Sequence, residues 1–160
     1  MKASWATGLS FGLTSGVITT LGLIVGLHSG THSRMVVIGG ILTIAVSDAM
    51  SDALGIHISE EASNKGSARH VWEATLATFL SKFVIAMTFL IPVIMYQLSH
   101  AIVISVIWGF LLLTTLSYVV ARTQAIPPWI AVVEHVMIAC LVVAVSHAIG
   151  YWVKDSFPTD

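Results

Sequence analysis

The sequence predicts an all-α integral membrane protein with five transmembrane helices. Of its 160 residues, 56% are hydrophobic and only 9% are charged, and the mean hydropathy is +0.92. Soluble domains carry about 25% charged residues, so this composition excludes an ordinary soluble globular protein. Five stretches of the chain are also apolar over the length of about 20 residues that a helix needs to cross a bilayer.

The five predicted spans follow one another closely, with short polar segments between them. They run from about Trp5 to Leu27, Met35 to Ile58, Val71 to Leu98, Ala101 to Val120 and Pro128 to Val153. Pro127 and Pro128 suit the first turn of the last helix, where a missing N–H has no cost. No connecting segment is long enough for a second domain, so residues 1–160 are predicted to form one five-helix domain.

The first span is unusually rich in glycine and hydroxyl residues, and we expect it to be a retained helix rather than a signal peptide. Its glycines repeat at intervals of four residues, at Gly8, Gly12 and Gly16 and again at Gly22 and Gly26. Such spacing lets another backbone approach closely. One interpretation is packing inside its own bundle. The other is a dimer seam or a polar path, which Ser15 and Thr19 would line. By contrast, the third and fourth spans are mostly Ile, Leu, Val and Phe, so we expect them to face lipid.

The basic residues predict the orientation, because loops on the cytoplasmic side carry an excess of Lys and Arg. With the N-terminus inside, the basic residues near the inner face are Lys2, Lys65, Arg69 and Arg122, and those near the outer face are Arg34 and Lys154. We therefore expect a cytoplasmic N-terminus and an external C-terminus in a multi-pass protein of the cell membrane. The net charge of -1 argues against a nucleic-acid partner.

Two aspartates lie inside the second span. Asp48 and Asp52 are four residues apart and therefore share one helix face. Each acid costs about 2.5–3.5 kcal/mol at a helix centre on insertion scales, so the pair needs compensation. One interpretation is a structural acid that is protonated or paired with Lys82. We favour a cation or proton site facing a wet cavity, because two carboxylates offer hard oxygens to a divalent cation such as Mn²⁺, Fe²⁺, Ca²⁺ or Mg²⁺.

A second polar cluster follows at the inner end of the same span. Glu60 and Glu61 come three and four residues after His57, so the three side chains converge if the helix continues for one more turn. One interpretation is a vestibule that collects metal ions. The other is a set of solvated charges at a helix end.

Other polar residues are weaker candidates for a path through the bilayer. Ser51 either bonds a carbonyl one turn back or supplies a ligand oxygen. Lys82 either pairs with an aspartate or snorkels to the interface. Glu134 and His135 are adjacent and point to different sides, so one of them is expected to reach the bundle interior as a proton carrier. Three histidines gather near the outer ends of the first and last spans, where metal binding and ordinary interfacial placement are both open: His28, His32 and His147.

Several runs of the sequence resemble the vacuolar iron transporter family, whose members carry Fe²⁺ and Mn²⁺ across membranes. The run SGVITTLGLIVGLHSG (15–30) is similar to the family's first helix, and SDALGIHISEEAS (51–63) to the end of its second. ATLATFLSKFVIAMTFLIPVIMY and ACLVVAVSHAIGYWV resemble its third and fifth helices. The resemblance implies the family's five-helix fold and a homodimer whose ion path runs between subunits, lined by the first two helices.

The chain departs from the family pattern at the ion path itself. The family's first-helix aspartate falls on Ser15, and the methionine of its second helix falls on Asp52. Asp48 has no counterpart, and the family's cytoplasmic helical insert is absent, with Glu60 and Glu61 standing where it would begin. A soft sulfur has thus become a hard oxygen, which favours Mn²⁺ or another hard cation as much as Fe²⁺.

These observations predict a homodimeric secondary transporter that moves a divalent metal out of the cytoplasm, coupled to protons. The metal is cargo, and no permanently bound cofactor is expected. The alternative is a non-transporting scaffold or partner subunit derived from the transporter fold. A membrane enzyme ranks last because the sequence has no nucleophile motif and no HExxH-like histidine pair.

Overall fold

The computed structural model describes residues 3–63, 67–123 and 127–157, which contain six helices. The helices are α1 (Ala3–Thr31), α2 (Arg34–Ala62), α3 (Ala68–Thr88), α4 (Leu90–Met95), α5 (Leu98–Thr123) and α6 (Pro128–Ser156). Within these residues, five helical segments are long and apolar enough to cross a membrane, with α3 and α4 together forming the third. The predictions of an all-α protein and of five helical segments long and apolar enough to span a membrane are therefore confirmed. Lys2 and Lys65, used to predict the orientation, lie outside the described residues.

The first two helices are joined by a tight turn of two residues. His32 has a φ of 51°, a left-handed conformation that lets the chain reverse. Ser33 then caps α2, since its side chain accepts a hydrogen bond from the backbone N–H of Val36. At the other end of the molecule Pro128 is the first residue of α6, as the sequence predicts, and Pro127 occupies the preceding cap position.

The third span is not the continuous helix that the sequence predicts from Val71 to Leu98. It is interrupted at Phe89, whose N–H bonds the carbonyl of Ala86, three residues back. Pro92 explains the interruption, because its ring nitrogen has no hydrogen to donate to the carbonyl of Thr88. The helical segment then ends at Met95, and Leu98 already belongs to the next helix.

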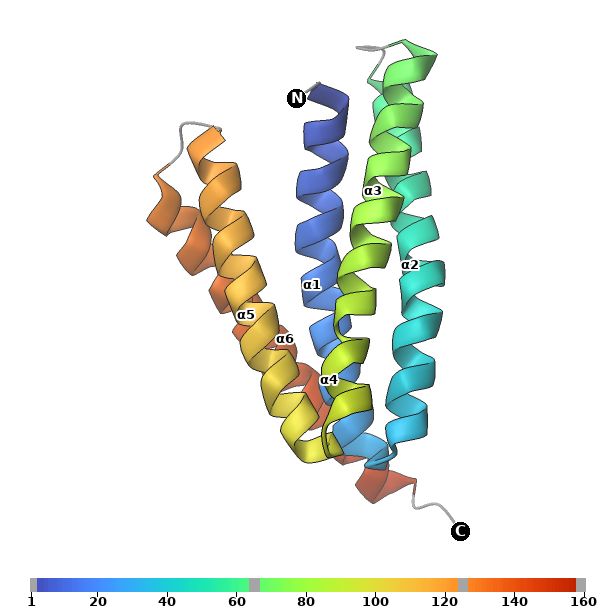
Figure 1. The fold of residues 1–160 in the computed structure, drawn as a ribbon, viewed down its shortest axis with the longest axis vertical. Coiled ribbons are helices and arrows are strands. Elements are labelled where there is room, and N and C mark those ends of the chain that lie inside the picture. The colour runs from blue at the N-terminus through green and yellow to red at the C-terminus, as the bar shows by residue number, and fades with distance from the viewer. Residues whose placement is uncertain (1–2, 64–66, 124–126, 158–160) are drawn as a thin grey trace.

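The six helices form a bundle that opens toward one end. The central helix is α1, which contacts α2, α3, α5 and α6. Figure 1 shows α1, α2 and α3 side by side, whereas the α5–α6 hairpin diverges from them toward the end where α1 begins. Helix α6 ends at the opposite end of the bundle from the start of α1, as an odd number of spans requires (Figure 1).

The glycines of α1 form two seams inside the bundle. Gly8, Gly12 and Gly16 face α3, and Gly22, Gly26 and Gly30 face α6. A methyl group on Gly12 would lie 2.6 Å from the carbonyl oxygen of Thr78, and one on Gly22 would lie 2.9 Å from a methyl of Val142. Only glycine permits such approach. The small-residue pattern therefore serves packing within one chain, the first of the two interpretations.

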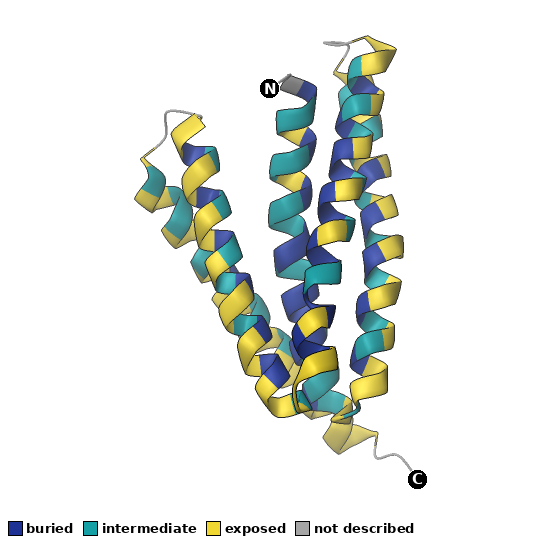
Figure 2. Ribbon diagram, viewed as in Figure 1, coloured by how far each residue is buried: buried dark blue, intermediate teal, exposed yellow. Residues whose placement is uncertain are grey.

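Burial differs sharply between the spans (Figure 2). In the most apolar stretch of the α3–α4 span, half of the residues are buried. In the corresponding stretch of α6, only 6% are buried. The prediction that the third span faces lipid is therefore wrong. Its mean composition is apolar, but one face carries the small residues that pack against the glycines of α1: Ala74, Ala77, Thr78 and Ser81. Large apolar side chains are exposed on α2 and α3 as well as on the α5–α6 hairpin, and α6 exposes more of them than any other described helix.

Candidate functional site

Lys82 of α3 lies at the centre of a polar cluster inside the bundle. Its ammonium is 2.5 Å from Asp48 Oδ2 and also pairs with Asp52 Oδ2. It donates a further hydrogen bond to Ser15 Oγ at 3.0 Å, and that hydroxyl donates to Asp52 Oδ2 at 2.7 Å. The four side chains come from α1, α2 and α3. Of the two roles open for Lys82 in the sequence, pairing with the aspartates is the one that the structure contains.

Local sequence patterns bring these side chains together. On α2, alanines at every fourth position, Ala45, Ala49 and Ala53, are buried and keep the helix close to its neighbours. Asp48 and Asp52 each come one position before such an alanine, which places them at the edge of the buried face. On α3, Lys82 is one turn beyond Thr78 and shares its buried face.

The two sides of the cluster differ in exposure. The Lys82 side chain is 2% exposed, whereas those of Asp48 and Asp52 are 26% and 22% exposed. Lys82 contacts Oδ2 of both carboxyl groups, and Ser15 donates to Oδ2 of Asp52. Among the described residues, no hydrogen bond or ion pair involves Oδ1 of either aspartate.

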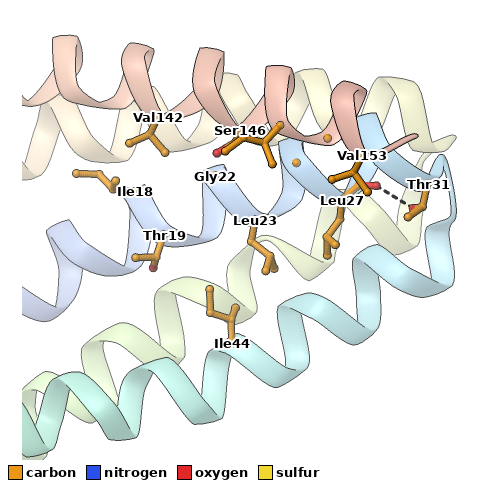
Figure 3. Close-up of a pocket in the computed structure, with 14 residues that line it drawn as sticks. Ile18, Thr19, Gly22, Leu23, Leu27, Thr31, Ile44, Val142, Ser146 and Val153 are labelled. Atoms are coloured by element: carbon orange, nitrogen blue, oxygen red, sulfur yellow. Dashed lines mark hydrogen bonds between the residues drawn. The ribbon is translucent and has the colours of Figure 1, made fainter. Parts of the chain in front are cut away.

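An apolar groove of about 620 Å³ approaches the cluster over α1, between α2 and α6. It extends from the C-terminal ends of α1 and α6, at Thr31 and Val153, to Thr19 and Ile44 (Figure 3). Thr19 lies one turn from Ser15, to whose carbonyl it donates a hydrogen bond of 2.9 Å. Ile44 is one turn from Asp48 on α2. The groove therefore ends one helical turn from the aspartates; its lining is apolar and includes neither of them, so it is not the wet cavity that the sequence predicts.

The predicted vestibule residues do not meet in this chain. Helix α2 does continue to Ala62, as convergence requires. However, His57 Nδ1 shares a 3.0 Å hydrogen bond with Thr75 Oγ1, and Glu60 pairs with His70 at 3.1 Å. Both contacts fasten the end of α2 to the start of α3, and Glu61 is exposed. The α3 partners of His57 and Glu60 carry no signal in the sequence, because only the tertiary fold sets them opposite α2.

The remaining candidates fall at scattered positions. Ser51 is exposed on α2 beside the cluster, and Glu134 is exposed on α6. His135 is the member of the 134–135 pair that faces another helix, since its Nδ1 lies 2.8 Å from Ser117 Oγ of α5. Near the C-terminal ends of α1 and α6, the rings of His28 and His32 are 5.0 Å apart, and His147 bonds Ser29 at 2.6 Å.

No group of three or more His, Cys, Asp or Glu side chains in the described parts of the chain is arranged to hold a metal ion. A divalent cation at Asp48 and Asp52 would therefore draw its other oxygens from Ser15, water or a second copy of the chain. Hard divalent cations take six or more oxygen ligands in proteins.

Comparisons with protein-family models, with curated proteins and with solved structures found no match to this chain. The resemblance to the vacuolar iron transporter family therefore stays a prediction that rests on the sequence runs alone.

Proposed function

We propose that this protein is a secondary transporter that carries a divalent metal cation such as Mn²⁺ or Fe²⁺ across the membrane, in exchange for protons. Asp48 and Asp52 bind the ion in mid-membrane. The observation that carries the proposal is the part-exposed pair of aspartates inside an apolar bundle. Ionisable groups inside spanning helices are costly and mark ion pathways in membrane proteins.

The arrangement of the polar groups supports a path rather than an isolated ion pair. Ser15 and Thr19 continue the polar line along α1 toward the groove that reaches the outer ends of α1 and α6. Protons and metal ions compete for the same carboxylate oxygens, and this competition is a physical basis for exchange.

We further propose that the transporter is a homodimer of the vacuolar iron transporter type. A second copy placed against α1 and α2 would supply the oxygens that one chain lacks. The orientation in the proposal has the start of α1 in the cytoplasm of the cell, where Arg69 and Arg122 also lie, with Arg34 and Lys154 outside. In this orientation His57, Glu60 and Glu61 stand near the inner end of the path.

The proposal is tested by flux of Mn²⁺ into liposomes that contain the purified protein, with and without a pH gradient. Asp52→Asn keeps the size of the side chain and removes its charge, and we expect it to abolish Mn²⁺-dependent flux. Glu134→Gln is the matched control, since Glu134 is an exposed acid on α6, away from the cluster. Equal flux through the wild-type protein and the Asp52→Asn variant would refute the assignment.

A non-transporting scaffold or partner subunit is the second candidate, and one observation favours it. Lys82 already pairs with both aspartates, so the cluster would be satisfied as a purely structural ion pair. In that case the wild-type protein would carry no divalent cation in liposomes and would co-purify with a second protein in fixed stoichiometry.

A further inference from the structure

The buried position of Lys82 has a consequence for how tightly the site holds an ion. The Lys82 side chain is 2% exposed, whereas the side chains of Asp48 and Asp52 with which it pairs are 26% and 22% exposed. An ion that binds the exposed part of Asp48 and Asp52 does so while Lys82 still pairs with both carboxyl groups. The ion and the ammonium then face each other across the same two carboxylates.

Lys82 has little room to retreat from an arriving ion. Its stem lies against the backbone of α1, so that a methyl group placed on Gly16 would lie 3.2 Å from Lys82 Cγ and 3.3 Å from Lys82 Cα. Thr78 and Ala86, one turn before and after it on α3, are buried as well. The positive charge of Lys82 therefore remains close to the site and repels the bound ion.

This repulsion acts on a divalent ion with twice the force that it exerts on a monovalent ion at the same distance. Two carboxylates without a nearby ammonium would hold a divalent cation strongly in a medium of low dielectric. A transported ion must bind well enough to enter and weakly enough to leave. The ammonium weakens binding without removing an oxygen ligand.

We infer that Lys82 sets the affinity of the carboxylate pair for its divalent cargo, holding it low enough for the ion to be released. This inference rests on the proposed transport function. It assigns Lys82 a role in release that differs from the structural role of a counter-ion, which would leave the affinity for cargo unchanged.

The test is the concentration dependence of Mn²⁺ flux through liposomes that contain the wild-type protein, Lys82→Met or Lys82→Arg. We expect Lys82→Met to lower KM by about ten-fold or more, because the repelling charge is gone. Its maximal rate should fall as well, because release becomes slow. Lys82→Arg keeps the positive charge, so its KM should stay within about two-fold of the wild-type value. Lys154→Met, which removes a lysine from the end of α6, is the control and should change neither parameter.

The outcomes separate the inference from the function on which it rests. Absence of Mn²⁺ flux through the wild-type protein would refute the transporter itself. Flux with the same KM in the wild-type protein and in Lys82→Met would refute the role of Lys82 and leave the transporter standing.

A stability measurement keeps the inference testable if Lys82→Met folds poorly. At a given ion concentration, tighter binding to the folded state stabilises it more, so Mn²⁺ should raise the Tm of Lys82→Met more than that of the wild-type protein. Recovery of folded Lys82→Met only in the presence of Mn²⁺ would support the inference equally. A Lys82→Met variant whose Tm or yield does not respond to Mn²⁺ would overturn it.

Discussion

The two halves of the bundle differ in how their helices pack and in where they carry charged side chains. Helices α1, α2 and α3 pack through small residues and enclose four polar side chains that satisfy one another. In the α5–α6 hairpin, Ser117 and His135 join the two helices by a hydrogen bond. The comparison indicates that the ion pairs of the described residues are concentrated in the first half of the bundle.

The contrast also explains where charge is tolerated. In the first half, the cost of burying Asp48, Asp52 and Lys82 is offset because the charges meet each other and a hydroxyl group. In the hairpin, Glu134 stays exposed on α6 near the helix start, within reach of the bilayer interface. Changes to charge should therefore be severe in one half and mild in the other.

The largest effect on stability should come from removing Lys82. Lys82→Met leaves two carboxylates without their counter-ion, and loss of one partner of a buried ion pair costs about 3–5 kcal/mol in the free energy of unfolding. The triple variant Asp48→Asn, Asp52→Asn, Lys82→Met removes all three charges and should recover most of that loss. Chemical unfolding in detergent micelles without divalent ions measures both values. Equal stability of Lys82→Met and the wild-type protein would mean that the ion pair contributes nothing, and the contrast between the halves would lose its basis.

The next effect concerns the glycine seam that lets the polar cluster form. In Gly12→Ala the added methyl would press on the carbonyl oxygen of Thr78, 2.6 Å away, so we expect a loss of about 1–3 kcal/mol. Gly55→Ala on α2 is the matched control, since no atom lies within 4 Å of the added methyl. Alanine has the higher helix propensity, so this control should be neutral or more stable by up to about 1 kcal/mol. If both variants unfold at the same denaturant concentration, close α1–α3 packing is not required.

A smaller effect is expected for the polar pair of the hairpin. His135→Phe removes the hydrogen bond to Ser117, and interhelical hydrogen bonds within membranes contribute about 0.6 kcal/mol on average. Mn²⁺ flux through His135→Phe should match that of the wild-type protein, because the pair lies outside the cluster. A complete loss of flux with intact folding would place a proton carrier in the hairpin and remove the functional contrast between the two halves.

Much of the fold could be predicted from the sequence, because hydropathy and span length depend on composition alone. The burial of the third span could not, since a mean over all residues of a helix conceals that one face is built of Ala74, Ala77 and Thr78. The sequence predicts one continuous helix through Pro92, because the residues around the proline are uniformly apolar. The structure instead interrupts that helix at Phe89.

Part of the candidate site could also be predicted from composition. Asp48 and Asp52 stood out because ionisable residues are rare in apolar helices, and the same argument singled out Lys82. Which of its two roles Lys82 takes depends on how α1, α2 and α3 meet, and spacing along one helix does not determine that. The contacts of His57 with Thr75 and of Glu60 with His70 were not predicted either, because they depend on the register between α2 and α3.

The most direct test of the account is to locate a bound cation in crystals of the wild-type protein grown with Mn²⁺, from the anomalous scattering of manganese. We predict a peak beside the Oδ1 atoms of Asp48 and Asp52, on the side away from Lys82. Manganese bound only elsewhere, with the two carboxylates held by Lys82 and Ser15 alone, would contradict a cation site at these aspartates.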